Sequence, residues 1–275
     1  MPRATEVSVL PRPWGRRRLA GAAAAVLTVT LVLTVSLVAT IVHLTRADPG
    51  IGAPPTAAAP VTVTAPGRVG VGRDEIAAAP MLSVAPADGR PGARMALDRP
   101  AVFLVPAPSG VGPVGVPAGF PHTPAGAVAQ LGAILGTVWQ RMDPPFTADV
   151  YAGWSAPGAP PVGGWVVLTR VRSFLQAAGL SRLEPGQVVV VTPVGALVKG
   201  VDGPDWTLAC VLVTIRARVR AQARIAYGHC ERMVWTGGRW LIGPGAAPAR
   251  APGTWPGSEA MIRAGWASWE ESPPQ

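Results

Sequence analysis

A 26-residue stretch near the N-terminus, residues 19–44, contains no Asp, Glu, Lys or Arg. As an α-helix it would be about 39 Å long, which exceeds the roughly 30 Å hydrocarbon core of a bilayer. Within lipid the backbone must satisfy its own hydrogen bonds, so a helix is the expected conformation. A secretory signal has an apolar core of only about 7–15 residues. We therefore predict an uncleaved transmembrane helix over 19–44, with a cleaved signal of unusual length as the alternative.

The residues on either side of this stretch predict its orientation. Residues 1–18 contain five arginines and a single acidic residue, Glu6, whereas Arg46 and Asp48 cancel on the other side. The basic flank of a membrane helix stays cytoplasmic. We therefore predict a cytoplasmic basic tail over 1–18 and an extracytoplasmic C-terminal part. The predicted localisation is the cell membrane, crossed once.

The composition excludes two broad classes of protein. Only 14% of the residues are charged, and 33 Gly and 32 Pro are present, which is not the profile of one compact soluble domain. Only one stretch is long enough to cross a bilayer, which excludes a polytopic transporter. The net charge of +9 suggests a nucleic-acid partner, but much of it lies in the tail before the helix. Lys199 is the only lysine, so the arginine excess reflects a high-GC genome and we expect no nucleic-acid partner.

Residues 45–119 have the composition of a spacer. Residues 48–119 contain 13 Pro and 11 Gly, with no Trp and no Cys. Such a stretch buries too little apolar surface to offset the entropy of ordering it. We predict a flexible Pro/Gly-rich linker over 45–119. Two short apolar pieces, 81–84 and 101–105, are candidate strands that dock elsewhere.

The residues from 120 to 275 have the composition of a folded domain, because they hold nine of the ten Trp and both Cys. Thr123 and Pro124 are typical of a helix start, and Pro144 and Pro145 end the apolar helical spacing that follows. Shorter helices are predicted over 147–154 and 168–178. The period then changes to two, which predicts a strand over 187–193, a long alternating segment over 206–227 with a turn near 218–221, and a hairpin over 231–242. A last helix is predicted after 256. Helices followed by strands indicate an α+β domain, with helices packed on a curved, cone-like antiparallel sheet.

The two cysteines lie symmetrically about the predicted turn. Cys210 and Cys230 would face each other across an antiparallel pair, and an extracytoplasmic location permits oxidation. We predict a disulfide, with two free buried thiols or a catalytic cysteine as the alternatives. His229 precedes Cys230 directly, but adjacent strand residues point to opposite faces, so this histidine would not activate that thiol.

One face of the alternating segment carries four arginines, Arg216, Arg218, Arg220 and Arg224. They are candidates for a partner surface, and a solvated sheet face is the alternative. Trp266 and Trp269, near the C-terminus, are candidates for an exposed patch of the same kind, although most Trp residues of such a domain lie in its core.

The histidines are the remaining candidates. His122 and His229 are candidate pocket residues, and local packing or capping is the alternative for His122. Two His and two Cys at these spacings do not form a recognisable metal site. We expect no catalytic residues, no metal and no cofactor.

Two segments carry a resemblance to known proteins, GFPHTPAGAVAQ over 119–130 and MVWTGGRWLI over 233–242. Together with the single anchor they resemble single-pass membrane proteins of high-GC Gram-positive integrative and conjugative elements. The outer domain resembles the cone fold of nuclear transport factor 2, and the layout is similar to that of the bitopic scaffold subunit of type IV secretion channels. The resemblance implies a non-enzymatic scaffold that associates with other proteins of a membrane apparatus or with itself.

Two alternatives from other functional classes remain open. One is a tethered ligand-binding or hydrolytic cone that uses His122, His229 or Cys230, which would require a polar-lined pocket. The other is an envelope or lipid binder that uses the basic face and would bind anionic vesicles in a salt-dependent way.

Overall fold

The computed structural model describes residues 71–272. The predicted cytoplasmic tail (1–18), the predicted transmembrane helix (19–44) and the first part of the predicted linker (45–70) lie outside these residues. Within 71–272, no helix combines the length and the apolar character needed to cross a membrane.

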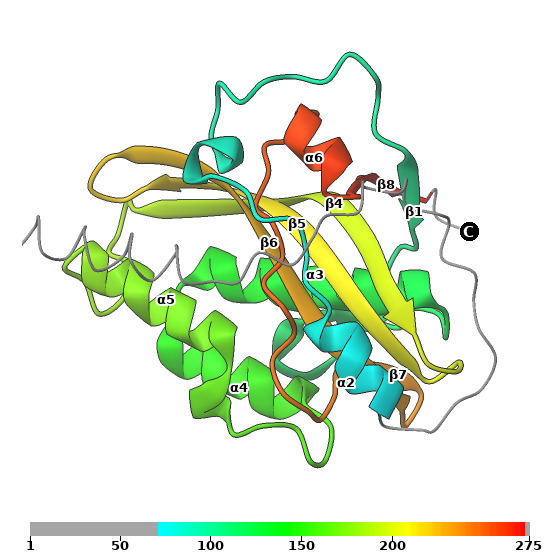
Figure 1. Ribbon diagram of the computed structural model, residues 1–275. Coiled ribbons are helices and arrows are strands. Elements are labelled where there is room, and N and C mark those ends of the chain that lie inside the picture. The colour runs from blue at the N-terminus through cyan, green and yellow to red at the C-terminus, as the bar shows by residue number, and fades with distance from the viewer. Residues whose placement is uncertain (1–70, 273–275) are drawn as a thin grey trace, which may run out of the picture. The chain divides into compact units, whose positions relative to one another are not determined.

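The described residues form a mixed α+β fold (Figure 1). Its α-helices are α2 (Val71–Ala78), α3 (Pro124–Arg141), α4 (Pro144–Trp154), α5 (Val166–Ala177) and α6 (Glu259–Arg263). Its strands are β1 (Val102–Val105), β2 (Gly110–Val111), β3 (Pro117–Ala118), β4 (Val188–Val201), β5 (Trp206–Arg218), β6 (Gln222–Thr236), β7 (Arg239–Ile242) and β8 (Ala267–Glu271). Three short 3₁₀ turns are η1 (Pro86–Gly89), η2 (Pro113–Gly115) and η3 (Val162–Gly164).

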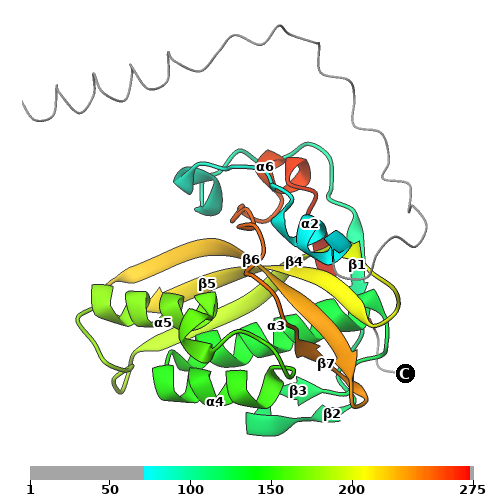
Figure 2. The ribbon, with the colours of Figure 1, turned by 60° about the horizontal axis from the view of Figure 1, so that its bottom comes forward.

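Six strands form one curled sheet in the order β1-β8-β4-β5-β6-β7. Neighbouring strands are antiparallel except β1 and β8, which are parallel. Strands β2 and β3 form a separate small pair. Helices α3, α4 and α5 cover one face of the large sheet, which we call the inner face, while α2 and α6 lie on the outer face (Figure 2). This arrangement confirms the predicted class, helices on a curved antiparallel sheet.

Helix α3 begins and ends where the sequence predicts. The hydroxyl of Thr123 accepts a hydrogen bond from the backbone N–H of Gly126 at 3.1 Å, and Pro124 follows at the first helical position. At the other end Met142 adopts a left-handed conformation with φ 47°. Asp143 then caps α4 by accepting from the N–H of Phe146 at 2.8 Å.

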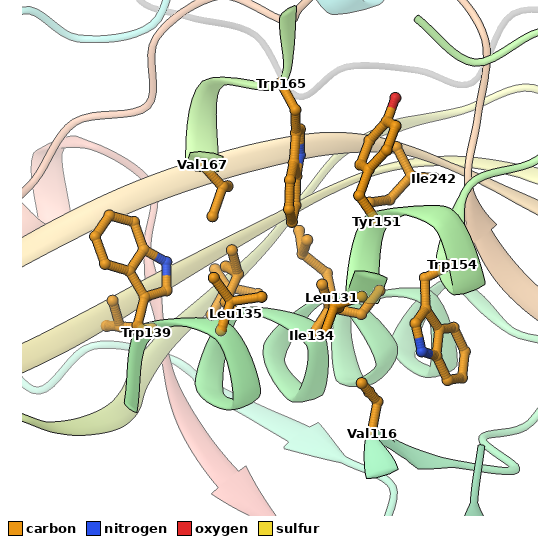
Figure 3. Packing of buried hydrophobic residues seen from close by; sticks show 14 of the residues in the cluster. Val116, Leu131, Ile134, Leu135, Trp139, Tyr151, Trp154, Trp165, Val167 and Ile242 are labelled. Atoms are coloured by element: carbon orange, nitrogen blue, oxygen red, sulfur yellow. The ribbon is translucent and has the colours of Figure 1, made fainter. Parts of the chain in front are cut away.

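The main hydrophobic core lies between α3, α4, α5 and the inner face of the sheet (Figure 3). Leu131, Ile134 and Leu135 of α3 are fully buried there and repeat at helical spacing. They pack in one cluster with alternate residues of β5, including Val211 and Val213. Burying each such side chain contributes about 1.5–3 kcal/mol. This core fixes α4 and α5 over the inner face of β6.

Two hairpins form the side of the sheet that consists of β5, β6 and β7. Strands β5 and β6 pair from Trp206 with Val234 to Arg218 with Gln222, so the predicted turn near 218–221 is confirmed. Strands β6 and β7 connect through Gly237 and Gly238, which have φ values of +58° and +78°. Two consecutive positive φ values match the tight hairpin turn whose twist fits that of the strands.

Residues 71–119 differ from the flexible linker that their composition predicts. Ile76 and Ala77 of α2 pack against Trp206 and Leu208 on the outer face, and the Lys199 ammonium donates to the carbonyl of Ala77 at 3.1 Å. Strand β1 joins the sheet beside β8, as expected for an apolar piece at 101–105. The piece at 81–84 forms no strand. The tertiary contacts order a segment whose own propensities are weak, so the folded domain begins well before residue 120.

The predicted C-terminal helix is also wrong in part. Helix α6 ends at Arg263, and Gly265 follows with φ +78°, a conformation that favours glycine. The chain then enters β8, which pairs with both β1 and β4. Backbone pairing along two strands replaces the helix that the apolar spacing of 261–269 suggested.

Candidate functional site

Four exposed arginines lie at the end of the β5–β6 hairpin, three of them on one face of the strands and Arg220 in the turn. We call this set the arginine face, and it consists of Arg216, Arg218, Arg220 and Arg224. Arg216 lies directly opposite Arg224 in the register of the hairpin. On strand β4, Val190 and Val188 lie opposite Arg216 and Arg218 and are 47% and 45% exposed. Directly paired residues share a sheet face, so this end of the sheet presents guanidinium groups beside aliphatic side chains.

The positive charge of the arginine face is not neutralised by ion pairs within the described part of the domain. Among the ion pairs formed within 71–272, none includes an arginine of this face. Arg220 differs from the others, because its Nε donates to the carbonyl of Ala178 at the end of α5 at 2.9 Å. Like charges directly opposite each other on a strand pair are destabilising. The fold therefore holds Arg216 against Arg224 without an internal counterion in its described part.

The two C-terminal tryptophans do not join this surface. Trp266 is 2% exposed, and its indole N–H donates to the carbonyl of Pro252 at 3.2 Å. The prediction of an exposed patch is therefore wrong for Trp266, because the segment after α6 turns it into the small core on the outer face. Trp269 lies half-buried on β8, where it lines a groove of about 880 Å³ along α3. Its ring fits beside Gly132, where a Cβ atom would overlap it.

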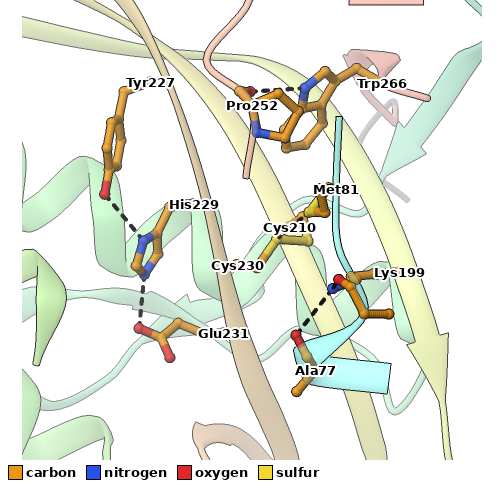
Figure 4. The surroundings of a disulfide bond; sticks show 11 residues. Ala77, Met81, Lys199, Cys210, Tyr227, His229, Cys230, Glu231, Pro252 and Trp266 are labelled. Atoms are coloured by element: carbon orange, nitrogen blue, oxygen red, sulfur yellow. Dashed lines mark hydrogen bonds and ion pairs between the residues drawn. A yellow bond between two sulfur atoms is a disulfide. The ribbon is translucent and has the colours of Figure 1, made fainter. Parts of the chain in front are cut away.

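The cysteines lie opposite each other on the outer face of β5 and β6, at disulfide distance, with a Cα–Cα separation of 4.0 Å (Figure 4). Met81 covers the pair, with its Sδ 3.8 Å from the Cys230 Sγ. The predicted pairing is therefore present. His229 points to the other face of β6, so the catalytic arrangement of His229 with Cys230 is absent from the fold.

His122 and His229 lie in different places. The ring of His122 stacks on Trp235, with ring centroids 4.4 Å apart, and its Nε2 lies 2.7 Å from the Asp205 carboxylate. This exposed ring packs just before the cap of α3, which matches the structural alternative. His229 instead lies on the inner face of β6 and is 6% exposed.

His229 belongs to a chain of polar side chains on β6. Its Nε2 lies 2.8 Å from Oε1 of Glu231, and its Nδ1 lies 3.4 Å from the hydroxyl of Tyr227 (Figure 4). The indole N–H of Trp165 donates to the same Oε1 at 2.8 Å. Glu231 is only 8% exposed. Residues two apart on a strand share a face, so the pattern Tyr-x-His-x-Glu over 227–231 was the sequence signal for this chain, and it was missed.

A cavity of about 380 Å³ lies over this polar chain. Tyr151 of α4 and Trp165 of α5 line one side, and the segment 243–251 lines another. Burial raises the pKa of Tyr227, while the Arg170 guanidinium lowers it in part. Burial also raises the pKa of Tyr151, and the negative charge of Glu231 raises it further. Sequence reasoning identified only His229 among these groups.

Without the Tyr227 hydroxyl, the protein is expected to lose less stability as the pH rises into the alkaline range. Because the folded pKa of Tyr227 lies above its ordinary value of 10.0, the unfolded chain loses this proton first as the pH rises. The tyrosine therefore stabilises the fold below pH 10, and that contribution is lost as the pH rises through the folded pKa. Thermal melts from about pH 9 to about pH 11 should show a shallower fall in Tm for Tyr227→Phe than for the parent protein. Equal slopes would contradict this assignment.

Within residues 71–272, no three or more His, Cys, Asp or Glu side chains come together in an arrangement suited to a metal ion. Comparison with known proteins adds no assignment to either the arginine face or the cavity. No family model matches the chain, and no curated protein or solved structure is significantly similar to it.

Proposed function

We propose that the chain is a non-enzymatic, single-pass membrane scaffold. Its α+β domain lies outside the membrane and assembles with other proteins of a conjugative transfer or secretion apparatus, or with further copies of itself. The sequence supports this proposal through the uncharged stretch at 19–44 and the basic residues before it. The cysteine pair at disulfide distance suits an oxidising, extracytoplasmic compartment.

The observation that carries the proposal is the arginine face. Arg216 and Arg224 face each other at short range, and an acidic partner surface would relieve their repulsion. Val188 and Val190 beside them add apolar area that a partner would cover. Complementary charge chiefly steers association and fixes its register. An acidic protein surface with an apolar centre is therefore the partner that this face fits.

The test is a crosslinking experiment in the cells that carry this gene, followed by purification of the tagged full-length chain in mild detergent and mass spectrometry. We expect other membrane-apparatus subunits, such as a transfer ATPase, to be recovered with it. The triple variant Arg216→Gln, Arg218→Gln and Arg224→Gln should lose most of that recovery. Arg220 is left unchanged because its bond to Ala178 holds the hairpin against α5.

The matched control removes the same charge from another surface. Arg99, Arg172 and Arg263 are all exposed, and their joint change to Gln should leave the recovery unchanged. Recovery of the unsubstituted chain only as a monomer, crosslinked neither to another protein nor to a second copy of itself, would reject the scaffold function. Equal loss of partners in both triple variants would show that net charge matters and that the arginine face does not.

A further inference from the structure

The cavity over Tyr227, His229 and Glu231 has the properties of a small-molecule site, and the scaffold function makes no use of it. Its volume of about 380 Å³ lies within the range of ligand pockets, roughly 300–1,000 Å³. It lies between the inner face of β6 and the start of α5. Most of its lining is apolar, with a few polar groups gathered on one wall, as is common in such sites.

One end of the polar wall accepts hydrogen bonds. Oε1 of Glu231 accepts a hydrogen bond from the indole N–H of Trp165 and also contacts Nε2 of His229. Oε2 of the same carboxylate has no hydrogen-bond partner among the described residues, and it is not sealed from solvent. A donor that reaches this carboxylate oxygen from the cavity would form a charge-assisted hydrogen bond, which is stronger than one between neutral groups. The Glu231 end of the cavity therefore favours a ligand that carries an O–H or N–H group.

The histidine contributes a second acceptor. In the neutral tautomer whose Nε2–H donates to the Glu231 carboxylate, Nδ1 is an acceptor. The Tyr227 hydroxyl is 3.4 Å from Nδ1, which is beyond the usual length of an O–H···N contact. A ligand O–H or N–H that reached Nδ1 of His229 would form a stronger hydrogen bond than the one from the Tyr227 hydroxyl.

The cavity is cationic beside Tyr227, at the other end of the polar chain from Glu231. Arg170 and Arg250 both line it and lie close enough to Tyr227 to act on the charge of its hydroxyl. Both arginines are exposed, and neither forms an ion pair within residues 71–272. Guanidinium groups pair with carboxylates through two parallel hydrogen bonds. The Arg170 end therefore favours an anionic group.

The two ends and the apolar walls together define one class of ligand. We propose that the Tyr227–His229–Glu231 cavity binds a small organic anion that carries a hydrogen-bond donor at the end away from its acidic group. The donor meets Glu231 and His229, the acidic group meets Arg170 and Arg250, and the apolar body lies along Tyr151 and Trp165. This ligand is bound without being transformed.

Three aromatic probes test this assignment by isothermal titration calorimetry with the full chain in detergent. The probe 4-hydroxybenzoate has both the donor and the carboxylate, benzoate lacks the donor, and phenol lacks the carboxylate. We expect 4-hydroxybenzoate to bind about tenfold or more tightly than either of the others, since a hydrogen bond to a charged group contributes about 1.5–3 kcal/mol. Absence of binding by 4-hydroxybenzoate, or equal affinity for all three probes, would overturn the proposal.

Matched variants of α5 place the binding in this cavity. Arg170→Gln should weaken 4-hydroxybenzoate and benzoate but leave phenol unchanged. Arg172→Gln removes the same charge from the same helix outside the cavity lining, and it should have no effect. Glu231→Gln should abolish the preference for 4-hydroxybenzoate over benzoate. Because Glu231 is buried, its change also disturbs the core, so the two exposed arginines of α5 keep the test decisive. Equal effects of Arg170→Gln and Arg172→Gln on binding would reject the site.

Discussion

Replacing Trp154 with Ala is expected to lower the free energy of unfolding by about 3–5 kcal/mol, the usual cost of emptying a buried aromatic site. Trp154 is 0% exposed, at the end of α4. Its indole N–H donates to the carbonyl of Pro113 at 3.0 Å, and its ring occupies the space that a side chain at Gly112 would need. The substitution therefore removes both core volume and the attachment of η2. Denaturant titration of the full chain, followed by circular dichroism, measures the effect.

Trp154→Phe is the milder variant. The phenyl ring keeps part of the apolar contact, but it loses the N–H and leaves part of the indole volume empty, so the expected cost is smaller than that of Trp154→Ala. Trp235→Ala is the surface control, because Trp235 is half-buried at the edge hairpin and stacks on the exposed His122. A smaller loss for Trp154→Ala than for Trp235→Ala would show that α4 does not anchor the β2–β3 segment as described.

Replacing Cys210 and Cys230 together with Ala should cost about 3 kcal/mol on the chain-entropy model, given their separation of 20 residues. The cross-link removes conformations from the unfolded chain, because it closes the loop that contains the β5–β6 turn. The measurement is the denaturation midpoint with and without a reducing agent. The parent protein should lose stability on reduction, and the double variant should not respond.

The conservative single-site control for this experiment is Met81→Leu. Met81 packs on the cysteine pair without being part of it, so Leu should keep the packing and the response to reductant. If reduction leaves the parent protein unchanged, the pair is not a disulfide in the protein as isolated.

The elements that the sequence predicted well depend on local chemistry. The cap of α3 needs only Thr123 and Pro124, and the β6–β7 turn needs only Gly237 and Gly238. The alternation over 206–227 also located the β5–β6 turn, since no single strand of that length would fit the domain. Each of these signals lies within a few residues of the feature it specifies.

The elements that were missed depend on distant partners. Residues 71–119 are poor in local signals, and α2 is held by contacts to β4 and β5. Trp269 shows helical spacing with Trp266, but its strand exists because Phe103 supplies a backbone partner from the other end of the domain. Propensity and period report on neighbours along the chain, so pairing between distant segments overrides them.

The candidate cavity shows the same division. His229 was a candidate from the residue type alone, and its place two residues from Tyr227 and Glu231 was visible in the sequence. The contribution of Trp165 was not, because it lies 66 residues before Glu231 and reaches it only after α5 packs on the sheet. Arg216, Arg218 and Arg224 could be placed on one sheet face from the strand period, whereas Arg220 lies in the turn between β5 and β6 and bonds to the end of α5.

The parallel pairing of β1 with β8 has a consequence for how this domain is made. The β4–β5 and β5–β6 hairpins join residues close in sequence, so they can form early. Strand β1 can pair only after β8, the last strand of the domain, has been synthesised. During synthesis the edge of β4 at Gly195 and Ala196 stays open until residues 267–268 leave the ribosome. A chain that stops before β8 therefore carries two unpaired strand edges, and such edges are sites of aggregation. The sheet is therefore completed late in synthesis, and only a chain that includes β8 has the edges of both β1 and β4 paired.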